Sequence, residues 1–272
     1  MSADTSQVGT QQVEAQVETQ DSARERGRSG GGTMAAVGAI TQRELAGLFY
    51  SPIAYVVGFV FLALTGYYFI SEVLVPGHEA SLRPLFERMA GLLVFALPLL
   101  TMRLIADEYA SGTIETLMCA PVSDTAVVLG KFFGTFLFYG VLLAATLLHA
   151  VVMAYFSSPI TMVTVVGYLG MLLLGALFIA VGVFASSCTR HQLLAAMLAV
   201  AVLSLFTFVV DYGAEYAPRD WLRQVCANVN VLWVFSDFAK GTIDSKSVIF
   251  FLSGIVFFLF LATKVMESRR WR

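Results

Sequence analysis

The residues of this sequence that could carry out chemistry are few and far apart along the chain. Its three cysteines form no closely spaced metal-binding pair, and His78-Glu79 lacks the second histidine of a zinc-protease helix. Gly130-Lys131 is similar to the end of a phosphate-binding loop, but Thr125 stands where that loop needs its first glycine and Phe132 where it needs Ser or Thr. We therefore expect no catalytic, cofactor-binding or metal-binding residue on this chain.

The composition explains why so little chemistry is present. Of the 272 residues, 58% are hydrophobic and 13% are charged, and the mean hydropathy is +0.77. Soluble domains carry roughly 25% charged residues, so a soluble enzyme, a secreted disulfide scaffold and a disordered chain are all excluded. The net charge of −2 gives no basic surface for nucleic acid.

Apolar runs predict an all-α membrane protein with six transmembrane helices. A helix needs about 20 apolar residues to cross roughly 30 Å of hydrocarbon. The chain offers six such runs, of which the second is short and contains Pro98, and the third and fourth are longer than one span requires. They are Ile53–Val75, Met89–Ile105, Ala126–Phe156, Thr161–Ser186, Leu193–Val210 and Val248–Val265.

The centres of these spans carry no ionisable residue. Proton and ion pathways normally place titratable side chains at such depth, so a proton-coupled transporter and an ion channel are both disfavoured. The polar side chains that do lie deep in the spans are scattered Ser and Thr residues. The span midpoints fall near Ala63, Leu97, Gly140, Leu174, Val202 and Val256.

Two segments precede the first span. Residues 1–33 are rich in Gln, Ser, Thr, Glu and Arg and predict a disordered cytoplasmic tail, whereas residues 34–272 form one membrane domain. Met34 to Ser51 predict an interfacial helix that lies along the membrane before Ser51-Pro52 turns the chain inward. Arg43 and Glu44 interrupt the apolar residues of this helix, and Glu44 falls on its apolar side.

The distribution of Lys and Arg predicts the orientation. With the N-terminus inside, eleven of the 17 Lys and Arg residues fall on the inner side, and an even number of spans places both termini in the cytoplasm. The outer segment from Asp211 to Ser247 is too apolar for a free loop. Its Val225–Phe238 stretch is too short to span and predicts an element that dips into the membrane or lies at its surface.

The inner loop between the second and third spans is the most informative part of the chain. Ser111-Gly112 predicts a turn, Thr113 can cap a short helix, and Pro121 would end it. The apolar side of that helix carries Ile114, Leu117 and Met118. Such a helix outside the membrane would dock on a partner protein, or alternatively lie back on the membrane. Ser123 is expected to cap the third span.

This loop resembles the signature of type-2 ABC transporter permeases. The resemblance rests on Asp107-Glu108, Gly112-Thr113-Ile114-Glu115 and Pro121-Val122-Ser123, followed by Gly130-Lys131. It covers residues 34–272. Three further strings are similar to the gliding-motility branch, namely Arg43-Glu44-Leu45, Tyr50–Tyr55 and Phe235–Asp244.

The resemblance implies an assembly of two permease subunits, identical or homologous, with two separate ATPase subunits that bind ATP and magnesium. It implies that the loop helix is a cytoplasmic coupling helix seated in the ATPase. Arg43 and Glu44 of the interfacial helix would also face the ATPase or, alternatively, contact only the lipid surface. Short half-helices would form an outer gate. The implied coupling residues are Glu108, Gly112, Thr113, Glu115 and Pro121, and the implied gate rim is Asp211, Trp233 and Asp237.

We therefore predict a multi-pass permease subunit of an ATP-driven exporter in the bacterial inner membrane, in contact with lipid and not with nucleic acid. The chain itself would not be an enzyme. The alternative is a scaffold or mechanical subunit of an envelope or gliding-motility complex that moves no solute. The sequence does not distinguish lipid, lipid-linked polysaccharide, hydrophobic small-molecule and polypeptide cargo.

Overall fold

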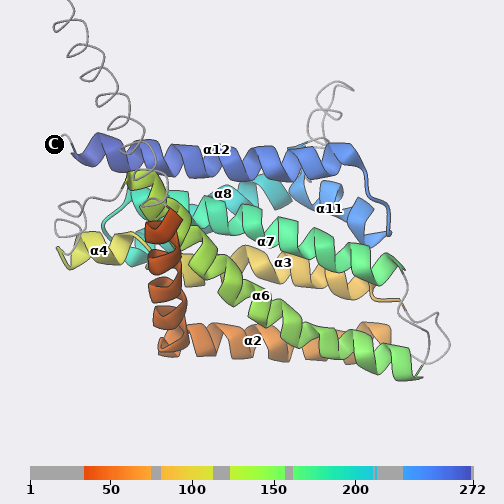
Figure 1. Ribbon diagram of the computed structural model, residues 1–272. Helices are drawn as coiled ribbons and strands as arrows, with labels where there is room; N and C mark the ends of the chain where they lie inside the picture. Colours follow the sequence, from red (N-terminus) through yellow and green to blue (C-terminus); the bar gives the residue numbers. More distant parts are fainter. Residues whose placement is uncertain are drawn as a thin grey trace, which may run out of the picture.

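The part of the chain that the structure describes is an all-helical bundle (Figure 1). The computed structural model describes residues 34–74, 81–112, 123–156, 162–210, 212 and 229–270. The predicted tail, residues 1–33, lies outside these ranges. An N-terminal helix covers residues 34–49. The elements that follow are α2 (Pro52–Tyr68), η1 (Phe69–Val73), α3 (Arg83–Thr101), α4 (Ala106–Ala110), α6 (Asp124–Phe156), α7 (Met162–Cys188), α8 (Gln192–Ser204), η2 (Leu205–Val209), α11 (Val231–Ala239) and α12 (Ser245–Arg270).

Among the described residues, six helical segments are long and apolar enough to cross a membrane, which confirms the six predicted spans. They are Pro52–Val73, Arg83–Ala110, Asp124–Tyr155, Met162–Cys188, Gln192–Val209 and Ser245–Arg269. Five of them begin within three residues of the predicted start. A serine immediately precedes the first and third spans, where the sequence places chain-turning and capping residues. The backbone N–H of Ala126 donates to Ser123 Oγ at 3.3 Å, as expected for an N-cap.

The predicted start of the second span, Met89, is wrong: the helix begins at Arg83. The intervening charges suggested a loop, but they pair with each other and with the preceding span. Arg83 Nε lies 3.1 Å from Glu87 Oε1, one helical turn away. Arg88 Nε lies 2.9 Å from Glu72 Oε1, near the end of the first span. Pairing allows charged side chains to continue a helix beyond its apolar part.

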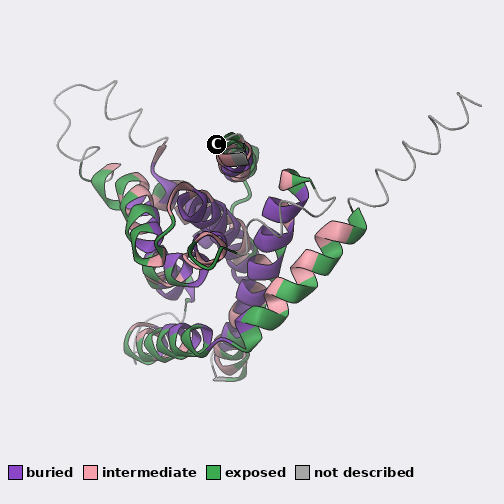
Figure 2. Cartoon of the chain, turned by 90° about the vertical axis from the view of Figure 1, so that its left-hand side faces the viewer, coloured by how far each residue is buried: buried purple, intermediate pink, exposed green. Residues whose placement is uncertain are grey.

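Helix α7 is the centre of the bundle. In its most apolar stretch 78% of the residues are buried, compared with 22–33% in the first, third, fifth and sixth spans. Figure 1 shows α7 running between α3, α6, α8 and α12, and Figure 2 shows the buried residues gathered in the middle of the bundle. The outer helices therefore present large apolar surfaces, as a bundle surrounded by lipid requires.

Small residues on α7 let the neighbouring helices approach closely. A Cβ atom added at Gly167 would overlap Phe86 of α3, one at Gly170 would overlap Phe238 of α11, and one at Gly175 would overlap the Tyr139 ring of α6. The Tyr139 hydroxyl also donates to the backbone carbonyl of Met171 at 2.8 Å. Close approach through small residues is how membrane helices associate without a hydrophobic driving force between them.

The N-terminal helix crosses one end of the bundle (Figure 1). Figure 2 looks from this end and shows the N-terminal helix side-on, with one face exposed. Its other face packs on the start of α6 at two glycines. A Cβ atom added at Gly130 would lie 2.6 Å from Ile40, and one at Gly134 would lie 2.8 Å from Glu44 Cβ. The N-terminal helix runs across the direction of the spans, as expected for an interfacial helix.

We predict that Gly175→Ala lowers thermal stability. The added methyl group has no room beside Tyr139, and overpacking of this kind costs typically 1–3 kcal/mol. Gly140→Ala on α6 is the matched control, because an added Cβ there meets nothing within 4 Å. Melting of the detergent-purified protein, followed by size-exclusion chromatography of heated samples, compares the two. Equal melting temperatures for both variants would contradict the close α6–α7 contact.

Candidate coupling site

The most unusual side chain in the bundle is Lys131, on the second turn of α6. Only 2% of it is exposed. Its Nζ donates to Glu44 Oε1 of the N-terminal helix and to Glu108 Oε1 of α4, both at 2.8 Å. We call these three residues the Lys131 triad and the end of the bundle that contains them the Lys131 end.

The triad sets the relative positions of three helices more than it adds to the free energy of folding. At an effective dielectric constant of 20, each ion pair has a gross attraction of about 6 kcal/mol at this distance. Removing the ammonium and two carboxylates from water offsets much of that gain. Losing one partner is different, since it leaves a buried charge without compensation. The triad therefore holds three helices together for as long as all three residues are present.

Helix α4 is bound by other helices as well. Gln192 Nε2, at the start of α8, donates to Asp107 Oδ1 at 2.7 Å. The Arg269 guanidinium of α12 lies 4.9 Å from the centre of the Tyr109 ring and also donates to the backbone carbonyl of Cys188. A helix of five residues has little stability of its own. Its position is set by these contacts with α6, α8 and α12.

The predicted coupling residues divide between the described and undescribed parts of the chain. Glu108 belongs to the Lys131 triad. Gly112 follows α4 with φ +72°, a left-handed conformation that favours glycine and confirms the predicted turn. Thr113, Glu115 and Pro121 lie outside the described residues. The structure thus describes the residues that lead into the predicted loop helix, and not that helix itself.

Contact of Arg43 and Glu44 with an ATPase stays a prediction, and the two side chains have different surroundings. Arg43 is exposed on the N-terminal helix, whereas Glu44 faces α6 and pairs with Lys131. The Thr41 hydroxyl donates to the carbonyl of Gly130 at 3.2 Å beside this pair. The position of Glu44 on the otherwise apolar side is therefore explained by a partner on another helix.

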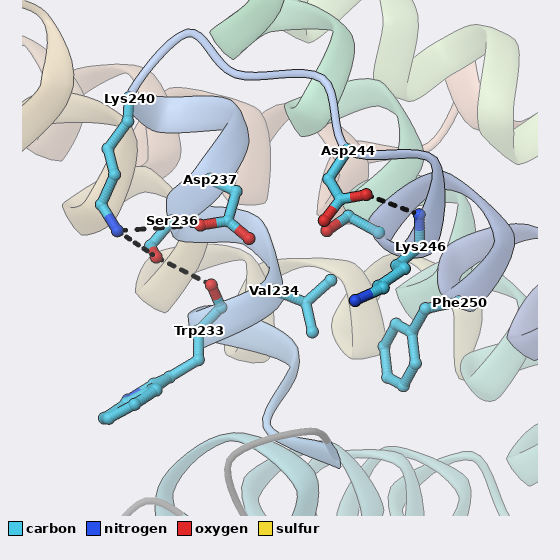
Figure 3. A pocket seen from close by; sticks show the side chains of 9 residues that line it. Trp233, Val234, Ser236, Asp237, Lys240, Asp244, Lys246 and Phe250 are labelled. Atoms are coloured by element: carbon cyan, nitrogen blue, oxygen red, sulfur yellow. Dashed lines mark hydrogen bonds and ion pairs between the residues drawn. The ribbon is translucent and has the colours of Figure 1, made fainter.

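The opposite end of the bundle contains the described part of the predicted gate rim. Trp233 and Asp237 lie on α11, whose nine residues are too few to span, as expected for a half-helix. They border a hollow of about 530 Å³ between α11 and the start of α12, with Lys240, Asp244 and Lys246 also on its wall (Figure 3). Asp211 lies outside the described residues.

Asn230 fixes the start of α11, and sequence analysis did not single it out. It is fully buried, and its Oδ1 accepts from the backbone N–H groups of Leu232 and Trp233. Its Nδ2 donates to the carbonyl of Thr207 in η2 at 3.3 Å. A cap that also bonds to a neighbouring span holds the short helix against the bundle.

The described residues thus form a multi-pass helical membrane protein with a tightly held short helix at one end. In the described part of the chain, no group of three His, Cys, Asp or Glu residues could hold a metal ion.

Comparison with known families then identifies the chain. A family model described as "ABC-2 family transporter protein" matches residues 2–218, and the chain belongs to this family. It is therefore a membrane permease subunit of an ABC transporter, a kind of subunit that is generally non-catalytic and works with an ATPase. The matched interval begins before residue 34, where the sequence resemblance starts, and ends before α11. A search of curated proteins gives no match.

Lys131 is the residue that sequence analysis missed as part of the site. In the sequence it is one of the positive charges on the inner side and part of the Gly130-Lys131 motif. The signal was available, because Lys131 lies inside the predicted third span, where a charge needs a partner. Glu44 on an apolar helix side was the matching signal. Lys131 lies near the start of its span, well before the midpoint near Gly140, and Glu44 lies outside the spans.

We predict that Lys131→Met strongly destabilises the Lys131 end. Two carboxylates would then face each other without the ammonium between them, at a cost of roughly 3–5 kcal/mol. Lys264→Met is the control, because that lysine is exposed and its ion pair in the described part of the chain is with Glu267 on its own helix. Thermal melting in detergent compares the variants.

The triple variant Glu44→Gln, Lys131→Met, Glu108→Gln should recover much of the loss, since it removes all three charges together. A Lys131→Met protein that melts like the wild type would show that the triad is not important for holding these helices.

Proposed function

We propose that this chain is the permease subunit of an ATP-driven exporter and that the Lys131 end is its coupling site. The observation that carries the proposal is the attachment of α4. This short helix directly precedes the loop that resembles a coupling helix, and its side chains bond to α6, α8 and α12. A force applied to the loop would reach these helices through contacts that already exist.

In the proposed cycle, ATP and magnesium bind to a separate ATPase, whose closure moves the loop helix. Thr113, Glu115 and Pro121 would form the docked segment, and Glu108 and Gly112 its stem. Through Lys131, the motion of α4 reaches Glu44 and thus the N-terminal helix. Arg43, exposed on that helix, would face the ATPase. Coupling requires that the ATP-bound partner bind the two permease conformations with different free energies.

The proposed assembly contains two permease subunits, identical or homologous, and two ATPase subunits. The Lys131 end would face the cytoplasm of a bacterial cell, with both termini on that side of the inner membrane. The exposed apolar faces of the outer helices fit contact with lipid and with the second permease. A path between the two permeases would open toward the opposite end, where Trp233 and Asp237, with Asp211, would border the exit.

The gliding-motility branch remains part of the proposal and rests on the sequence strings described above. One of them, Phe235–Asp244, covers the end of α11 and the turn before α12. A mechanical role in such a system would use the same coupling site. The cargo would then be a cell-surface component or no solute at all.

We predict that tagged wild-type protein, purified from its own host in mild detergent, recovers an ATPase, and that Glu115→Arg loses it. Reversing the charge would place like charges, or an unpaired charge, at the proposed docking surface. Glu267→Arg is the matched control, because Glu267 lies on α12 at the same end and pairs there with Lys264. Recovery is measured by ATP hydrolysis in the eluate.

Unchanged recovery with Glu115→Arg would remove Glu115 from the docking surface. Equal loss of the ATPase with both variants would indicate that the net charge at this end of the bundle, and not Glu115 in particular, determines binding. A wild-type protein that recovers no ATPase would contradict the exporter and favour the scaffold.

A further inference from the structure

The helix of the second membrane-spanning segment is interrupted at a point where its own sequence contains no helix-breaking residue. Helix α3 ends at Thr101 and α4 begins at Ala106, with a turn over residues 102–105. These four residues are Met, Arg, Leu and Ile, all compatible with a helix. Pro98 lies further back, inside α3. The cause of the break must therefore lie elsewhere in the structure.

The Ser186 hydroxyl of α7 occupies the break. In an uninterrupted helix the N–H of Ala106 would donate to the carbonyl of Met102. Here Ser186 Oγ stands between them: it accepts from the N–H groups of Ile105 and Ala106, both at 3.0 Å, and donates to the Met102 carbonyl at 3.1 Å. Insertion of a side chain into the helical hydrogen-bond ladder is an established cause of kinks.

The surrounding packing makes this insertion specific. Ser186, Ile105 and Ala106 are all fully buried, so water does not compete for the two N–H groups. One turn earlier on α7, Gly182 lies so close to Thr101 that an added Cβ would overlap its side chain. Gly182 and Ser186 therefore share the side of α7 that faces the end of α3 and the break.

We propose that Ser186 is a positioning residue for coupling: its hydroxyl sets the direction in which α4 leaves α3, and so places Glu108 on Lys131. The coupling part of this inference rests on the proposed function. Without the hydroxyl, the two buried N–H groups lose their acceptor, or the helix closes into a continuous one through residue 110. In either case α4 turns away from its present position and the coupling loop moves with it.

Ser187 provides a matched control for Ser186. It is the next residue on the same helix, it is equally buried, and its hydroxyl donates to the carbonyl of Phe184 in its own helix. Ser187→Ala removes a buried hydroxyl without affecting the break. Ser186→Thr is a second variant, which changes the side chain but keeps a hydroxyl.

The position of α4 can be measured directly in the full-length protein. Nitroxide labels at Ala110→Cys on α4 and Leu137→Cys on α6, both exposed positions, are introduced with the three native cysteines replaced by serine. We expect Ser186→Ala to shift the distance distribution, and Ser187→Ala and Ser186→Thr to keep that of the parent. An unchanged distance in Ser186→Ala, or a shift in Ser186→Thr equal to it, would overturn the positioning role.

A second measurement tests coupling. The difference in ATP hydrolysis rate between the complex and the isolated ATPase should shrink at least about fivefold in Ser186→Ala, the lower limit of typical coupling between sites. It should persist in Ser187→Ala. A shifted α4 with unaltered hydrolysis would overturn the coupling role. If the wild type recovers no ATPase, the proposed function fails, while the distance measurement still decides whether Ser186 positions α4.

Discussion

A buried ammonium group on the second turn of α6 constrains the whole Lys131 end. An ammonium in a low-dielectric interior requires negative charge within hydrogen-bond distance, because it has lost its hydration. Lys131 obtains that charge from two other elements, the N-terminal helix and α4. The N-terminal helix can come close enough only because Gly130 and Gly134 have no side chain to separate it from α6. The ion pairs of Lys131 and the close packing at the two glycines thus hold the N-terminal helix at the same point on α6.

The attachment of α4 gives this arrangement its functional meaning. Five residues do not form a stable helix alone, so α4 exists because its neighbours hold it. Lys131, Ser186, Gln192 and Arg269 come from four different helices, and each contacts α4 or the turn before it. An element held in this way cannot move independently of the bundle. That property suits the stem of a coupling helix in a permease of the ABC-2 transporter family.

The opposite end of the bundle also contains a short helix that is held in place by contacts with its neighbours. Helix α11 is also too short to be stable alone, and it is held by Asn230 and by Phe235 and Phe238 packed over Gly170 of α7. Helix α7 therefore contacts the short helices at both ends of the bundle. Its glycines allow close packing, and its buried position makes it the element that connects the two sites.

The sequence alone determined what depends on local physics. Apolar length placed six spans, Ser123 and Pro52 fixed where two of them begin, and Gly112 marked the turn after α4. The sequence did not predict the correct start of the second span, because the charge of Arg88 is neutralised by an ion pair with Glu72 of another helix. Tertiary structure alone decided that Glu44 and Glu108 share Lys131, from 87 and 23 residues away, and that Ser186 breaks a helix some 80 residues earlier. Such pairings depend on which helices pack side by side, and that is a property of the whole bundle.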